Sequence, residues 1–166
     1  MHYIRRIQIW LCIVAGFFFV APAHADNTVG HAQVVIMENI VVTEQAGINF
    51  GLIHPQSGQT GKVTISPSGD VNASNSTHNN GLPTHAAHFV ASGTPAANVL
   101  ISFMNGSLNG TGDPMDINNF THDAGVTPSF DGSGVLDFHV GADVNLNLNQ
   151  QSGSYNGTYT ITLNYQ

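Results

Sequence analysis

Apolar and polar residues alternate with a period of two along most of the chain, which is typical of β-strands with one buried face. The last residues show this pattern most clearly, because aromatic and aliphatic side chains occupy one set of positions and threonines the other. The apolar set is Tyr159, Ile161, Leu163 and Tyr165. The pattern therefore predicts a strand that runs to the end of the chain.

Shorter alternating runs predict further strands near residues 63–66, 99–103 and 136–148. The run at 99–103 is apolar on nearly both faces, which favours a central position in a sheet. Gly141 and Ala142 interrupt the run at 136–148, and this interruption predicts a bulge or a tight corner. Turn-forming Gly, Pro and Asn clusters separate the runs, and no long helical period occurs. These features predict an all-β antiparallel sandwich.

The segment from residue 28 to residue 53 is unusual because it holds more apolar sequence than one edge strand needs. Two apolar runs, Val34–Met37 and Ile40–Val42, flank Glu38 and Asn39. One interpretation is two consecutive strands, and the other is a first segment that leaves its own domain. Both interpretations stay open at the level of the sequence.

The first 25 residues have the pattern of a secretory signal peptide, with Arg5 and Arg6 before an apolar run and small residues at Ala23 and Ala25. Residues 26–166 are then one domain, whose only Lys or Arg is Lys62 against 10 acidic residues. Such a surface disfavours binding to nucleic acid or to anionic lipid. The sequence predicts no membrane insertion after signal removal, and Cys12 would leave with the signal.

No sequence motif of a known catalytic centre occurs, so we expect a protein that is not an enzyme and needs no cofactor. His78, His85 and His88 are weak candidates for a metal site, because their spacing lets imidazoles converge if the loop turns. Surface histidines in a chain poor in lysine are the simpler explanation. Asp113, Asp116, Asn118 and Asn119 could ligate Ca²⁺, but turn formation is the usual reason for these residue types in a polar loop.

The C-terminal strand resembles the C-terminal signature of chaperone–usher pilins, because Tyr165 is penultimate and Gly153 is the fourteenth residue from the end. The resemblance implies an immunoglobulin-like sandwich that lacks one strand, which a donor strand completes. It also implies a groove for a subunit or chaperone at Gly153, Tyr155, Tyr159, Ile161, Leu163 and Tyr165. The corresponding donor would lie within residues 26–37, with Thr28, Gly30, Ala32, Val34 and Ile36 on its inward face.

Residues 32 to 166 also resemble a family of secreted Gram-negative proteins known as domain of unknown function 4402. The resemblance rests on Ala32-x-Val34, Ile48-x-Phe50-Gly51-x-Ile53, Phe89 with Gly93, Val140-Gly141 and Gly153-x-Tyr155-x-Gly157-x-Tyr159. It implies an architecture more than an activity.

The sequence thus predicts a pilin-like subunit of a surface fibre or adhesin that assembles with copies of itself or with related subunits. A periplasmic chaperone and an outer-membrane usher are the further partners that the resemblance implies. The expected route leads through the periplasm of a Gram-negative bacterium to the cell surface or an extracellular fibre. The alternative is a self-contained secreted sandwich that binds a glycan or a host surface through its Asn- and Gly-rich loops, with Phe120, Phe130 and Tyr155 as stacking candidates.

Overall fold

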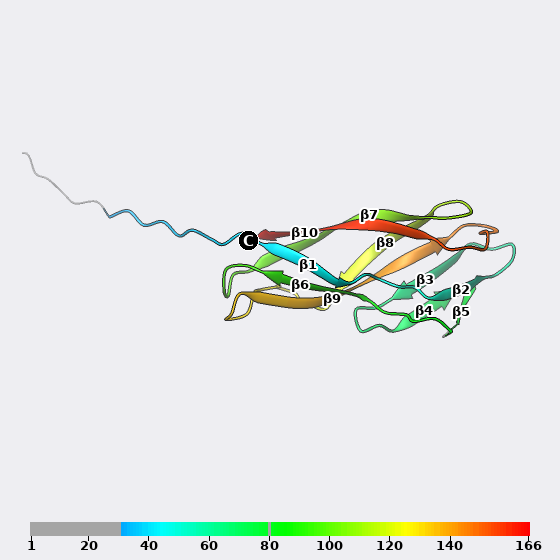
Figure 1. Cartoon of the computed structure of the whole chain (residues 1–166), viewed down its shortest axis with the longest axis horizontal. Coiled ribbons are helices and arrows are strands. Elements are labelled where there is room, and N and C mark those ends of the chain that lie inside the picture. Colours follow the sequence, from blue (N-terminus) through cyan, green and yellow to red (C-terminus); the bar gives the residue numbers. More distant parts are fainter. Residues whose placement is uncertain (1–30, 80) are drawn as a thin grey trace, which may run out of the picture. The chain divides into compact units, whose positions relative to one another are not determined.

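The computed structural model describes residues 31–79 and 81–166, and residues 36–166 form one compact unit (Figure 1). All regular structure in the described residues is β-strand, as the alternation predicts. The strands are β1 (Val41–Ala46), β2 (Leu52–Pro55), β3 (Gly61–Ile65), β4 (Val71–Ser74), β5 (Ser76–Asn79), β6 (Ala87–Ser92), β7 (Val99–Asn109), β8 (Met115–His122), β9 (Val135–Leu146) and β10 (Asn156–Tyr165).

The main sheet has the strand order β1-β6-β9-β8-β7-β10, and β3 and β4 join it through β9. Every pairing is antiparallel, and β2 and β5 form a separate two-stranded sheet. The main sheet curls into a nearly closed sandwich, with β7 and β10 in one layer and β1, β6 and β9 in the other (Figure 1). The prediction of an all-β antiparallel sandwich is therefore confirmed.

The strands β1 and β10 are the two ends of this order, so each pairs along one side only in the described part of the chain. The start of β1 and the end of β10 lie at the same end of the sandwich (Figure 1). The two strands consequently run in opposite directions. The candidate site lies beside β10 and the segment that follows β1.

The sandwich encloses two apolar clusters of buried side chains. One cluster packs β6, β7 and the first half of β9 around Phe138, which stacks on Phe89 with a centroid distance of 5.7 Å. The other packs β3, β8 and the second half of β9 around Val63, Ile117 and Val144. Phe120 and Tyr159 contact both clusters, so they join the two halves of the core.

Of the bulge or tight corner that the sequence predicts at Gly141, no corner forms, because the strand β9 continues through this position. Residues 135–140 pair with β6 and residues 142–146 pair with β3, so β9 changes its partner at the glycine. A side chain at Gly141 would collide with the carbonyl oxygen of Ile65, which explains why glycine occupies the crossing. The bulge lies in the neighbouring strand β8 instead, where Asn119 has a φ of 52°.

The predicted alternation in β10 is confirmed, because the exposure of its residues alternates along the strand. Its partner β7 is an inner strand of the sheet, as predicted, but Leu100 and Met104 on its outer face are exposed. Two backbones approach closely where β7 bulges opposite Tyr159. Side chains at Gly106 and Gly157 would collide with carbonyl oxygens of the partner strand, so this pairing requires both glycines.

The residues before β1 form no strand from position 31 to position 40. The first strand starts at Val41, and the next residues toward β2 make a single bridge between Asn49 and His85. The apolar run that precedes β1 is exposed to solvent, with Val34 at 81% and Ile36 at 86% of full exposure.

Candidate functional site

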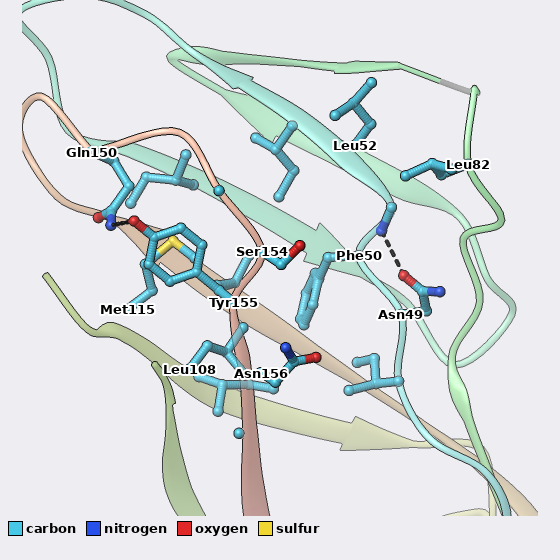
Figure 2. Close-up of a pocket in the computed structure, with 18 of the residues that line it drawn as sticks. Asn49, Phe50, Leu52, Leu82, Leu108, Met115, Gln150, Ser154, Tyr155 and Asn156 are labelled. Atoms are coloured by element: carbon cyan, nitrogen blue, oxygen red, sulfur yellow. Dashed lines mark hydrogen bonds between the residues drawn. The ribbon is translucent and has the colours of Figure 1, made fainter. Parts of the chain in front are cut away.

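A groove of about 860 Å³ lies between the segment that follows β1 and the residues that lead into β10. One wall is the segment from Glu44 to Pro55, and the other is the segment from Gln150 to Gly157 with Tyr159. Figure 2 shows Phe50, Met115, Leu108 and Tyr155 converging on this hollow. The groove is therefore apolar in its depth and open at its mouth.

A second, shallower hollow of about 460 Å³ lies beside the last residues of β10. It is lined by Met37–Ile40 on one side and Leu163–Tyr165 on the other. Between the two hollows, Ile161 is partly buried against the core. Both hollows lie beside β10, whose other edge pairs with β7, and we use the name acceptor groove for the two hollows together.

Tyr155 fixes the loop that forms one wall of the groove. Its hydroxyl donates to the carbonyl of Gln151 at 2.8 Å and accepts from Gln150 Nε2 at 2.9 Å and from the backbone N–H of Gly112 at 3.0 Å. Figure 2 shows the bond to Gln150 and the ring beside the groove. Gly153, with a φ of 155°, completes the loop because a side chain there would collide with Thr111.

Tyr159 lies where the groove meets both core clusters. Its ring packs on Phe120 at 4.8 Å and against the edge of Phe89 at 6.5 Å. Its hydroxyl is buried without a hydrogen-bond partner among the described residues. Burial, and then the negative charge of Glu44, raise the pKa of the Tyr159 hydroxyl above its ordinary value, so it remains a protonated donor.

Tyr165 joins the end of β10 to the residues that precede β1. Its hydroxyl donates to the carbonyl of Glu38 at 2.8 Å and accepts from the backbone N–H of Thr94 at 2.7 Å. The Thr94 hydroxyl in turn accepts from the backbone N–H of Glu38 at 2.7 Å. Both backbone groups of Glu38 are thereby bound.

The structure places all six groove residues predicted from the sequence on β10 or on the loop before it. Gly153, Tyr155 and Tyr159 line the large hollow, and Leu163 and Tyr165 line the small one. The opposite wall, Glu44 to Pro55, was not predicted, because its proximity to β10 comes from the curling of the sheet and has no signal in the sequence.

The predicted donor residues fall partly outside the described residues, where Thr28 and Gly30 lie. Ala32, Val34 and Ile36 are described, are exposed and belong to no strand. Their role as a donor stays a prediction.

The three candidate metal-binding histidines have separate partners. The ring of His78 lies 3.0 Å from the Thr84 hydroxyl, and that of His85 lies 3.1 Å from the Ala86 carbonyl. His88 pairs with Asp137 at 2.9 Å and stacks on His139 at 4.7 Å. Among the described residues, no group of three or more His, Cys, Asp or Glu side chains is placed to hold a metal ion.

Several residues considered for calcium and for sugar stacking have other partners, and Asp116, Asn118, Asn119 and Phe120 lie in strand β8 and not in a loop. Asn119 donates to Asp143, and the Asp113 carbonyl accepts from Gln150. Phe130 is 2% exposed, and Phe120 stacks on Phe103 at 5.2 Å. Of the three stacking candidates, Tyr155 alone lines the groove.

Asp143 on β9 is a buried carboxylate that the sequence analysis did not single out. Lys62 Nζ lies 3.0 Å and Asn119 Nδ2 lies 2.9 Å from its Oδ2 atom, and Thr64 donates to Oδ1 at 2.5 Å. Burial by itself would raise the pKa of Asp143, but the three donors outweigh it and hold this pKa below its usual range. The network ties β3, β8 and β9 together on the outer face of the sheet.

The fold and the site define the class of protein: a curled, all-β antiparallel sandwich with two hollows beside its last strand. A family model described as domain of unknown function (DUF4402) matches residues 40–165, so the chain belongs to this family, as its sequence features predict. Comparison with curated proteins and with solved structures finds no significant match. Over the described residues, no helix is long and apolar enough to cross a membrane.

Proposed function

We propose that this protein is a non-enzymatic, exported, pilin-like subunit of a surface fibre or adhesin, and that it assembles by donor-strand complementation. The single observation that carries the proposal is the acceptor groove between the free edges of β1 and β10. An exposed strand edge presents unpaired backbone N–H and C=O groups, which a strand from another chain can satisfy.

The occupant that fits the groove is the N-terminal arm of a second copy, which we define as residues 26–37. The arm supplies apolar side chains that its own structure leaves exposed, among them Val34 and Ile36. Between Thr28 and Met37 it contains no Asp, Glu, Lys or Arg, so its insertion buries no formal charge. Gly30 and Ala32 suit the shallower parts of the groove.

The topology also sets the direction in which copies would add. Glu38, at the base of the arm, is bound beside Tyr165, where β10 ends. A donor that runs antiparallel to β10 places the body of its own subunit at the opposite end of the sandwich from Glu38 of the acceptor. Repetition of this head-to-tail contact does not close on itself and produces a fibre.

The absence of charge on the two long strands nearest the groove supports close packing. Neither β7 nor β10 contains Asp, Glu, Lys or Arg, and the Thr side of β10 faces solvent. Export through a signal at residues 1–25, a periplasmic chaperone that protects the groove and an outer-membrane usher complete the proposal. The mature subunit would reach the cell surface or an extracellular fibre of a Gram-negative bacterium.

The proposal is tested with a synthetic peptide of residues 26–37 labelled with a fluorophore. The exported protein is unfolded and refolded with an excess of the peptide, and size-exclusion chromatography with light scattering gives the mass of each species. We expect a one-to-one complex and loss of larger assemblies. The control peptide carries Val34→Asp and Ile36→Asp and should not bind.

A folded protein that binds neither peptide and stays monomeric would overturn the proposal. That result would favour the self-contained binding module, whose loops would then be searched for a glycan or host-surface ligand.

A further inference from the structure

The N-terminal arm has two possible destinations, and the structure indicates what selects between them. The apolar runs Val34–Met37 and Ile40–Val42 flank Glu38 and Asn39, which is the pattern of a hairpin with a two-residue loop. Such a hairpin would lay the arm along the free edge of β1 in its own subunit. It would fill the acceptor groove in cis and leave nothing to donate.

The register of this hairpin decides which face of the arm would point inward. With Glu38 and Asn39 as the loop, Met37 pairs with Ile40 and Val35 pairs with Val42. Ile40 and Val42 pack against the core, and directly paired residues share a face of the sheet. The cis arrangement therefore buries Val35 and Met37, whereas the proposed donor face in trans buries Val34 and Ile36.

The bonds to Glu38 oppose the hairpin. Two-residue hairpin loops use turns in which the first loop residue takes a positive φ, and Glu38 is not among the described residues with positive φ. Its N–H is bound by the Thr94 hydroxyl and its C=O by the Tyr165 hydroxyl. A reversal of the chain at Glu38 would break both bonds.

The position of Tyr165 is itself fixed by its surroundings. Its ring lies 6.0 Å from that of Phe130, and its hydroxyl also accepts from Thr94 N–H. A side chain at Gly93 would meet the Tyr165 hydroxyl and the Phe130 ring at 2.6 Å. The end of β10 is thus a rigid anchor for the base of the arm.

We propose that Tyr165 and Thr94 form a latch on Glu38 that prevents the arm from closing on its own groove and so commits it to a second copy. This inference rests on the proposed function, because it concerns the choice between two occupants of the same groove. Tyr165 and Thr94 are positioning residues, since they act through the backbone of Glu38.

The test uses Tyr165→Phe, which keeps the ring and removes the hydroxyl. Loss of the hydroxyl bonds should shift the ratio of closed monomer to assembled protein about tenfold toward the monomer. Light scattering across a dilution series measures this shift, and the closed monomer should melt at a higher temperature than dissociated wild type. Thr94→Ala, which removes the bond to the Glu38 N–H, provides a second variant if Tyr165→Phe folds poorly.

Two further substitutions separate the latch from a general structural role. Val35→Asp, added to Tyr165→Phe, places a charge on the face of the arm that only the cis arrangement buries, and it should restore assembly. Val34→Asp in the wild-type background places a charge on the face of the arm that the trans arrangement buries, and it should abolish assembly. If Tyr165→Phe and Thr94→Ala assemble like wild type, the latch is refuted while the proposed function stands. If Val34→Asp assembles like wild type, the donor-strand proposal itself fails, and the latch with it.

Discussion

Asp143→Asn is the substitution that most directly tests the role of the buried carboxylate. Asp143 is 5% exposed, and its Oδ2 atom accepts from both Lys62 and Asn119. An asparagine has the same shape, and its carbonyl oxygen can still accept from Thr64. Its NH₂ group then faces Lys62 and Asn119 in place of a charged oxygen atom. The substitution therefore removes two charge-assisted hydrogen bonds without opening a cavity.

The expected loss in the free energy of unfolding depends on how exposed the hydrogen-bond partners of Asp143 are. Hydrogen bonds to a charged group are worth about 1.5–3 kcal/mol each. The Lys62 side chain is 46% exposed, so its ammonium can turn to water and its share must be discounted. We expect a loss of about 2–3 kcal/mol in the free energy of unfolding, which corresponds to a fall of roughly 6–12 °C in the melting temperature of a domain of this size.

The assay is urea unfolding at neutral pH, followed by circular dichroism. Asp137→Asn is the matched control, because Asp137 lies on the same strand, pairs with His88 and has a side chain that is 58% exposed. Its substitution should change the free energy of unfolding by about 0.5 kcal/mol or less. If Asp143→Asn costs no more than this control, the network is not a significant source of stability.

Further predictions concern acid, backbone contact and the groove. The pKa of Asp143 is lower in the folded than in the unfolded chain. The ionised carboxylate therefore stabilises the fold above about pH 5, and this stabilisation is lost as the pH falls through the pKa of Asp143 in the folded state. In urea titrations, the difference in the free energy of unfolding between wild type and Asp143→Asn should shrink from pH 7 to pH 3. Gly157→Ala places a methyl group against the Ser107 carbonyl and should lower the free energy of unfolding by about 1–3 kcal/mol. The control is Gly132→Ala, whose methyl group meets nothing within 4 Å. Its free energy of unfolding should stay within about 0.5 kcal/mol of wild type in the same assay. Tyr159→Phe removes a buried hydroxyl without a partner in the described structure and should leave the stability of the dissociated subunit unchanged or raise it by about 1 kcal/mol; a fall of more than about 1 kcal/mol would show that the hydroxyl is bonded in solution.

The strands with strong alternation could be predicted from the sequence because their inward and outward residues differ in kind. The C-terminal strand is the clearest example, with Tyr159, Ile161 and Leu163 inward and threonines outward. At Gly141 the sequence left a bulge and a tight corner open, because a glycine that permits close approach of Ile65 has the same local signal as a glycine at a corner.

Half of the groove and the buried network could not be predicted, because both depend on contacts between residues far apart in the chain. The bond between Tyr165 and Glu38 spans 127 positions, and the pair Lys62 and Asp143 spans 81 positions. The identity of these residues does not indicate which distant residue each of them contacts. The curling of the sheet decides the first contact, and the pairing of β3 with β9 decides the second.

The most direct test of the account compares the thermal unfolding of the exported protein with that of a version in which residues 26–37 are repeated after Gln166 on a flexible linker. The added strand would start where β10 ends and run antiparallel to it, in the direction proposed for the donor in the fibre. Burial of its Val and Ile side chains should raise the melting temperature by roughly 10–20 °C and leave a monomer. A repeat that carries Val34→Asp and Ile36→Asp should have no such effect. The claim that the sandwich is open would be contradicted by two results together: a protein that is monomeric without the added strand, and a melting temperature that neither repeat changes.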